Sequence, residues 1–310
     1  IQGIDLDVRE AYNHSIIGVT ALTLKRKNFF LDGLDFDFNI GYAIGRYGLC
    51  DKAMNRYDWD GNKLPPVSPY GGEQNNYPSD GNNHSKELTS KLNLEYTIDK
   101  HHGVNLNVYF DRNSIRPKDP LMDKALGFQS NFPSRMNTLT LALSYDLTLF
   151  EGRFQNAFTL KNYKFSSHSR SINVYSVSAP EPVSVSKSYF GFNDAMRYKL
   201  TNDWMVKASF NSEVRIPTNE ELIGNGYSIL ASPALKPERT SGVNVGMMYR
   251  HIKQNGGLVE IEFNGFYNQL KDMIRFTPDL IPTMARYRNF GSVRTRGIEL
   301  DVKADVCSSV

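Results

Sequence analysis

The sequence predicts an all-β fold, an antiparallel transmembrane β-barrel to which this chain contributes about eleven strands. The first observation is strict alternation of apolar and polar residues over 136–149, a segment longer than the about ten residues that a tilted strand needs to cross a membrane. The second is that tight turns and long polar loops alternate along the chain, which would place every long loop at one end of a barrel. The third is the polarity of the positions opposite the apolar ones, which suits a wet interior.

Each predicted strand rests on alternation between two punctuating segments. The strands expected in order are 17–25, 34–42, 88–98, 104–110, 136–149, 153–166, 190–200, 204–215, 243–249, 259–267 and 298–303. Long loops are expected at about 45–86, 113–135, 167–186, 216–239 and 269–292. In 153–166 the apolar positions change phase at Tyr163 and Phe165, which predicts a β-bulge.

The two faces of these strands predict which side meets lipid. Leu139, Leu141, Leu143 and Leu147 are expected to face lipid, whereas Asp35 and Asp37 require a polar interior. Aromatic residues near the tight turns form a predicted girdle: Tyr96, Tyr145, Tyr198, Trp204 and Tyr249. Because single-chain bacterial barrels close with an even number of strands, about eleven strands indicate part of a larger barrel.

Composition and motifs argue against several other classes of protein. A net charge of +3 is too small to favour nucleic acid as a partner, and no apolar run is long enough for a transmembrane helix. Cys50 and Cys307 show no zinc-site spacing, and the topology places them about a membrane thickness apart, so we expect no disulfide between them. The segment 58–62 resembles a calcium loop only in part, and a polar turn is the favoured interpretation. No catalytic motif is present, so we predict a non-enzyme without a resident metal or cofactor.

Two motifs resemble those of TonB-dependent outer-membrane receptors. The first has the pattern R-x-P-T-x-x-E-L followed by x-P-x-L-x-P-E, with Ser232 where the family usually has Asn; its residues are Arg215, Pro217, Thr218, Glu221, Leu222, Pro233, Leu235, Pro237 and Glu238. The second has the pattern N-x-G-x-x-x-x-x-G-x-E; its residues are Asn289, Gly291, Gly297 and Glu299. We predict structural roles for both sets, with Gly291 and Gly297 allowing a bend or a close approach.

The resemblance implies a receptor with a plug inside a barrel of 22 strands in the cell outer membrane. It implies uptake of a scarce ligand, such as a siderophore, a cofactor, a glycan or a peptide, driven by the periplasmic TonB protein. The partners it implies are outer-membrane lipid, TonB, the small-molecule or glycan ligand and, as a further candidate, a surface lipoprotein. We expect residues 1–310 to be one partial barrel domain, with the plug and the final strands outside this sequence.

Aromatic residues in the first long loop are the predicted ligand contacts, because aromatic faces suit sugars and flat chelates. They are Tyr57, Trp59, Tyr70 and Tyr77. The alternative is a loop packed on its own side chains. Two other functions stay open at this point: a passive outer-membrane barrel such as a porin or an adhesin, and a soluble all-β binding domain.

Overall fold

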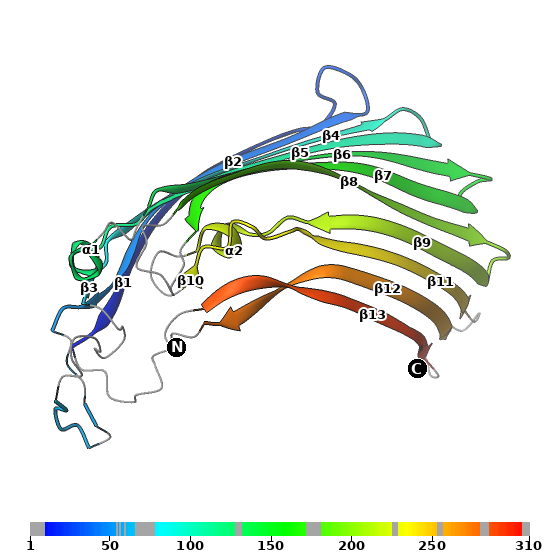
Figure 1. The fold of residues 1–310 in the computed structure, drawn as a ribbon. Helices are drawn as coiled ribbons and strands as arrows, with labels where there is room; N and C mark the ends of the chain where they lie inside the picture. The colour runs from blue at the N-terminus through cyan, green and yellow to red at the C-terminus, as the bar shows by residue number, and fades with distance from the viewer. Residues whose placement is uncertain are drawn as a thin grey trace, which may run out of the picture.

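The fold is one curved, mostly antiparallel sheet (Figure 1). The computed structural model describes residues 10–53, 55, 57–58, 60–65, 78–127, 132–171, 181–224, 229–252, 257–279 and 285–305. The thirteen strands follow the order β1-β2-β4-β5-β6-β7-β8-β9-β11-β12-β13-β10, with β3 attached to β2. The prediction of an all-β barrel wall is therefore confirmed.

Eleven of the strands in the described part of the chain are long. They are β1 (Tyr12–Arg26), β2 (Leu34–Asp51), β4 (Asn83–Thr97), β5 (His102–Arg116), β6 (Ser134–Leu149), β7 (Phe154–Ser171), β8 (Glu181–Lys199), β9 (Trp204–Arg215), β11 (Glu238–Ile252), β12 (Leu258–Pro278) and β13 (Ala285–Ala304). Short elements lie within the long loops: β3 (Ser79–Asp80), α1 (Pro120–Leu126), α2 (Asn219–Ile223) and β10 (Ile229–Leu230). Neither helix described is long and apolar enough to cross a membrane.

The strands extend further toward the long loops than predicted, so the expected loop boundaries were wrong. β2 continues to Asp51 instead of ending at 42, and β12 continues to Pro278 instead of ending at 267. The physical reason is that both faces of a strand are wet beyond the apolar band. Alternation is lost there, although the backbone ladder between neighbouring strands continues.

The sheet has an inner face, defined here as the side on which α2 packs, and an outer face on the opposite side. On β6 the leucines predicted to face lipid lie on the outer face, where Leu143 is 50% exposed. The predicted aromatic girdle also lies on the outer face by strand parity, near the tight turns. There the rings of Trp204 and Tyr249 have centroids 5.0 Å apart. The outer face thus carries an apolar band with an aromatic edge.

The bulge predicted in 153–166 is absent. The pairing of β7 with β6 is continuous from Leu149↔Phe154 to Arg135↔His168. Tyr163 and Phe165 lie on the inner face, where Phe165 is only 1% exposed. The phase change therefore marks the height at which the inner face becomes apolar, because a loop packs against it.

That packing forms the hydrophobic core of the described chain. Three residues of the wall meet three residues of the loop between β9 and β11; the cluster is Ile115, Met136, Phe165, Leu222, Ile223 and Leu235. α2 also contacts β13, so the loop crosses the inner face between two parts of the wall. The core holds this loop against the inside of the sheet.

Candidate functional site

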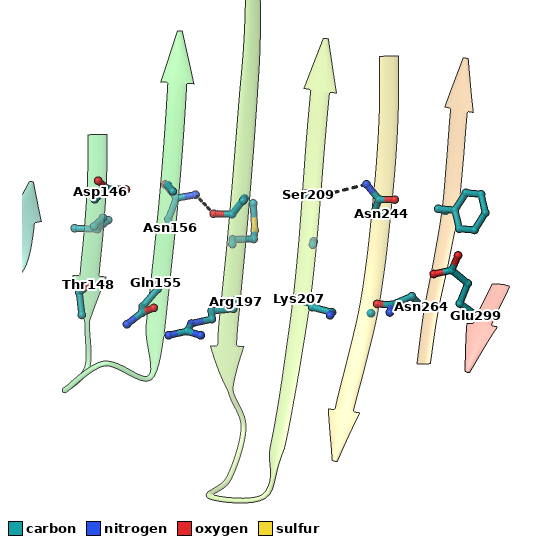
Figure 2. Close-up of a pocket in the computed structure, with 17 residues that line it drawn as sticks. Asp146, Thr148, Gln155, Asn156, Arg197, Lys207, Ser209, Asn244, Asn264 and Glu299 are labelled. Atoms are coloured by element: carbon teal, nitrogen blue, oxygen red, sulfur yellow. Dashed lines mark hydrogen bonds between the residues drawn. The ribbon is translucent and has the colours of Figure 1, made fainter. Parts of the chain in front are cut away.

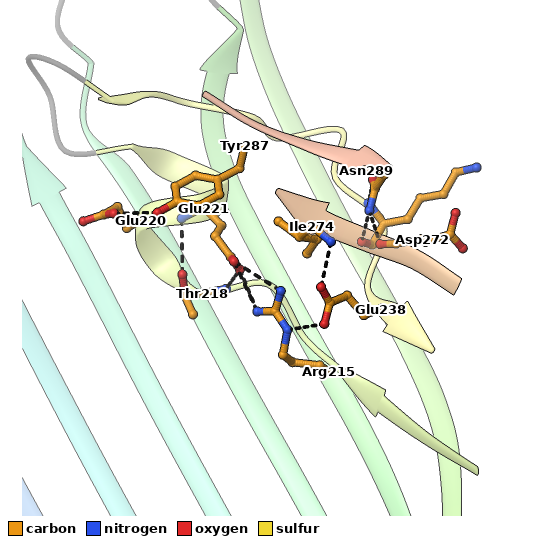
Figure 3. Close-up of polar contacts among 10 residues, drawn as sticks. Arg215, Thr218, Glu220, Glu221, Glu238, Asp272, Ile274, Tyr287 and Asn289 are labelled. Atoms are coloured by element: carbon orange, nitrogen blue, oxygen red, sulfur yellow. Dashed lines mark hydrogen bonds and ion pairs between the residues drawn. The ribbon is translucent and has the colours of Figure 1, made fainter. Parts of the chain in front are cut away.

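Arg215, the last residue of β9, is the centre of the first motif (Figure 3). Its Nη1 and Nη2 atoms donate to the carboxylate of Glu221 at 2.9–3.2 Å, and its Nε donates to Glu238 at 2.6 Å. The other oxygen of Glu238 accepts the backbone N–H of Ile274 at 2.7 Å. One guanidinium thereby connects β9, α2, β11 and β12.

The charges of this network reinforce one another. Hydrogen bonding to Glu238, with a smaller contribution from Glu221, raises the pKa of the Arg215 guanidinium above its usual value. In return, the hydrogen bond from Arg215 lowers the pKa of the Glu238 carboxyl. Both groups lie at the long-loop end of their strands, beyond the apolar band.

The start of α2 explains the remaining residues of the first half of the motif. Thr218 is the N-cap, and its Oγ1 accepts the N–H of Glu221 at 3.3 Å, while Glu221 accepts the N–H of Thr218 at 2.7 Å. This reciprocal capping box fixes a helix of only five residues. Pro217 and Leu222 are fully buried beside it. The contacts of this part of the motif are thus internal to the fold.

The two motifs, far apart in sequence, meet in space. Asn289 of β13 donates from Nδ2 to the backbone oxygens of Lys236 at 2.8 Å and Asp272 at 2.7 Å, and its Oδ1 accepts the N–H of Lys236 at 2.8 Å. Lys236 lies between Leu235 and Pro237, which are buried together with Pro233. Asn289 therefore fastens the loop after α2 to the wall.

The two glycines of the second motif differ in their surroundings. A Cβ on Gly297 would lie 2.8 Å from Cζ of Phe266, its cross-strand neighbour, so the ring lies directly over the glycine. A Cβ on Gly291 would have no atom within 4 Å. A close approach exists at Gly297, whereas nothing near Gly291 explains a need for glycine there.

A cavity of about 610 Å³ lies on the inner face (Figure 2). Its polar lining comes from neighbouring strands and includes Arg197, Lys207, Asn244, Asn264 and the motif residue Glu299. Lys207 forms an ion pair with Glu262 of β12.

Charged side chains lie on the inner face beyond this cavity as well. Lys161 Nζ lies 2.5 Å from Glu213 Oε1 there. Buried or wet charge pairs of this kind suit the interior of a barrel, not a lipid-facing surface. The lining of the 610 Å³ cavity offers both hydrogen-bond donors and acceptors to a polar ligand.

The predicted ligand-binding aromatics are only partly within the described chain. Tyr57 is described and lies in an isolated bridge with Lys63, whereas Trp59, Tyr70 and Tyr77 fall outside the described residues. Asp58 uses its carboxylate within its own turn, accepting the N–H groups of Asp60 and Asn62, and the hydrogen bond from Asn62 lowers its pKa. Among the described residues, no group of three or more His, Cys, Asp or Glu is placed to hold a metal ion.

One cluster at the long-loop end was not predicted from the sequence. Asp119 is the N-cap of α1 and is 4% exposed. Its carboxylate accepts Ser79 Oγ at 2.5 Å and the N–H groups of Asp80 and Met122 at 3.0 and 3.1 Å. It ties the loop after β5 to the loop after β2. The signal in the sequence was an aspartate directly before a proline that opens a short helix.

Only one of the two cysteines lies in the described part of the chain, so the predicted absence of a disulfide between them is not tested. Cys50 is a buried free thiol at the long-loop end of β2. Cys307 lies outside the described residues. The prediction that the two form no disulfide stays a prediction.

Fold and site together define the wall of a barrel-type receptor: an antiparallel sheet with an apolar outer band, a polar inner face and a loop folded over that face. The chain belongs to the TonB-dependent receptor-like β-barrel family, whose model matches residues 18–306. A search of curated protein sequences returns no match.

Solved structures show the same fold at low sequence identity. The copper transporter OprC is similar with a TM-score of 0.65 and 14% identity over 94% of this chain and 43% of that chain. The FrpB iron transporter from Neisseria meningitidis (F3-3 variant) gives 0.61 and 15% over 96% of this chain and 42% of that one. The Serratia marcescens hemophore receptor HasR, solved with its hemophore HasA and heme, gives 0.57 and 13% over 96% and 47%. The chain therefore spans less than half the length of these proteins.

Proposed function

We propose that this chain is part of the barrel wall of an outer-membrane receptor that takes up a scarce ligand with energy from the TonB system. The observation that carries the proposal is the cavity of about 610 Å³ on the inner face, lined in part by polar side chains, on the same face across which α2 fixes a loop. The ligand classes are a siderophore, a cofactor, a glycan or a peptide.

The names of similar structures favour one part of this range. They refer to heme, iron and copper, so a metal chelate is the first class to test. Because identity to them is at most 15%, these names guide the choice of probes and nothing more.

Within the receptor we assign different roles to the two sets of predicted residues. The motif residues hold the loop and the strands in place, since Arg215, Glu221, Glu238 and Asn289 bond to the protein itself. Ligand contact is assigned to the loop aromatics Tyr57, Trp59, Tyr70 and Tyr77, and to the polar lining of the inner cavity. TonB, outer-membrane lipid and a surface lipoprotein are the proposed partners.

The test is uptake by cells that produce the full-length protein from a plasmid, in isogenic hosts with and without TonB. Hemin, an ⁵⁵Fe-loaded siderophore, cobalamin, a maltooligosaccharide and a short peptide serve as labelled probes at nanomolar concentration. We expect accumulation of one probe that depends on both the protein and TonB. Uptake that rises linearly with concentration and ignores TonB would instead identify a passive barrel.

A further inference from the structure

The outer face of β5–β8 carries a polar, basic surface directly above the apolar band. Strand parity places three cations there: Arg112, Arg135 and Lys164. The strand register makes them neighbours, because Arg112 pairs with Asn137, Lys164 with Leu139 and Arg135 with His168. Hydroxyl groups of Ser166, Ser184 and Ser186 continue the same rows across β7 and β8. We call this set, with Asn137, the basic outer patch.

A groove of about 320 Å³ lies within the patch. Its outer-face lining consists of Arg135, Asn137, Ser166, His168, Ser184 and Ser186. Neighbouring strands order these side chains: Asn137 Nδ2 donates to Ser166 Oγ at 3.2 Å, and His168 Nδ1 lies 2.8 Å from Ser184 Oγ. The groove therefore presents fixed hydroxyl and amide groups beside a cation.

The charge of the patch has one sign. On the described part of these four strands, the outer-face positions above the apolar band include no aspartate and no glutamate. Arg112, Arg135 and Lys164 are exposed, and none of them forms an ion pair with a described carboxylate. On the inner face of the same sheet, by contrast, Lys161 is paired with Glu213. A group of cations of one sign at the edge of the apolar band indicates an anionic partner outside the barrel.

The side chains below the patch indicate which kind of anion would bind. Immediately beneath it on the same face lie large exposed apolar side chains: Leu141, Leu143, Leu160, Phe190 and Phe192. An anion that carries acyl chains can place them on this band while its headgroup meets the cations above. Free phosphate could use only the upper half of this arrangement.

We propose that the basic outer patch binds the phosphate-bearing headgroup of an anionic lipid in the leaflet at the long-loop end. Guanidinium groups suit phosphate because their planar donors bind two oxygens at once. The proposal is independent of the transported ligand and rests only on the membrane placement proposed above.

The test uses the full-length protein purified in a non-ionic detergent and titrated with diphosphoryl lipid A, with binding followed by native mass spectrometry. The variant R112Q/R135Q/K164Q removes the three cations. The control K100Q/R153Q/K199Q removes the same charge at the tight-turn end. Each basic side chain near an anionic lipid surface contributes about fivefold in affinity, so we expect the patch variant to bind on the order of 100-fold more weakly. The control should bind like the unmodified protein.

Further measurements separate the sources of a change. Heat-modifiable gel migration reports whether each variant is a folded barrel, and the single variant R135Q, with an expected loss of about fivefold, replaces the triple variant if that does not fold. Dephosphorylated lipid A should bind weakly to all variants, and millimolar inorganic phosphate should not compete. Equal affinity of the folded patch variant, or an equal loss in the control, would overturn the lipid site. A protein that forms no barrel in detergent would instead contradict the proposed function.

Discussion

At the scale of single residues, the same few side chains hold several parts of the chain at once. Glu221 caps its own helix and binds Arg215, while Glu238 binds Arg215 and the backbone of β12. The sequence identified these residues as a motif but not as one network, because their partners come from strands that only the fold brings together. His101 and His102 are adjacent in sequence, and their ring centroids lie 6.3 Å apart. Each ring nevertheless binds a different partner, the backbone oxygen of Thr148 and the hydroxyl of Tyr145.

Replacing Arg215 with methionine should destabilise the protein by about 2 kcal/mol, because two largely shielded carboxylates lose their cation. This destabilisation lies between those typical of breaking a buried ion pair and a surface ion pair, because Arg215 itself is 42% exposed and solvent screens its charge. Urea unfolding of the protein in detergent measures the change. The control is Lys25→Met, which breaks the exposed pair with Asp37 and should cost less than about 1 kcal/mol. Equal effects of the two substitutions would contradict the special role of Arg215.

Glu238 should make part of the stability depend on pH. Its pKa in the folded protein is lowered from the ordinary 4.5, so its contribution is complete above that value and is lost as the pH falls through the lowered pKa. We therefore expect unmodified protein to be more stable than E238Q at about pH 7 and about pH 5, with the difference shrinking below about pH 4. Unfolding curves of both proteins over this range provide the test. A difference that grows on acidification would show that Glu238 is not the group responsible.

At the scale of elements, alternation predicted the position of all eleven long strands but not how far they extend. Alternation records the contrast between lipid and water, so it fades where both faces are wet, although the hydrogen-bond ladder continues. The same limitation produced the false bulge at Tyr163 and Phe165. Phe165 is buried on the inner face because residues of α2 pack against it, and contact with a loop from a distant part of the chain leaves no local periodic signal. α2 itself is too short to produce a helical period.

Leu222 should be the residue that holds α2 against the wall, since it is fully buried among Phe165, Met136 and Ile115. Leu222→Ala removes this contact and should cost about 2–5 kcal/mol locally, depending on how far the loop can collapse. Limited proteolysis of the loop between β9 and β11 should become faster, while the strands remain protected. The control is Leu31→Ala in a tight turn, where the side chain is exposed. Unchanged protection of the loop would mean that the ion pairs alone hold it.

Gly297 tests the packing between β12 and β13. In Gly297→Ala the new methyl would lie 2.8 Å from the ring of Phe266, so the ring must move. Crowding of this kind costs about 1–3 kcal/mol, or less where the ring can swing aside. Gly291→Ala on the same strand meets nothing within 4 Å and serves as the matched control, with an expected change within about 0.5 kcal/mol. Urea unfolding distinguishes the two, and a larger effect at Gly291 would contradict the assignment.

At the scale of the whole molecule, each strand separates two environments, and function depends on that separation. The inner face carries the charged pairs, the cavity and the folded loop, whereas the outer face carries the apolar band and the basic outer patch. The family and the general architecture could be predicted from the sequence. The basic outer patch could not be predicted, because its residues come from four strands and become neighbours only through the register of β5–β8.

Two adjacent residues of β6 provide a direct test of this two-sided design. Leu143 lies in the outer apolar band, and Ala142 lies on the inner face between Asn107 and Lys161. An arginine facing lipid near the middle of a bilayer costs about 2–4 kcal/mol, whereas the same side chain in a wet interior remains hydrated. L143R should therefore lower the yield of folded, heat-modifiable barrel in outer membranes, and A142R should have little effect even though it adds a charge beside Lys161. If A142R impairs assembly more than L143R, the inner and outer faces have been assigned the wrong way round.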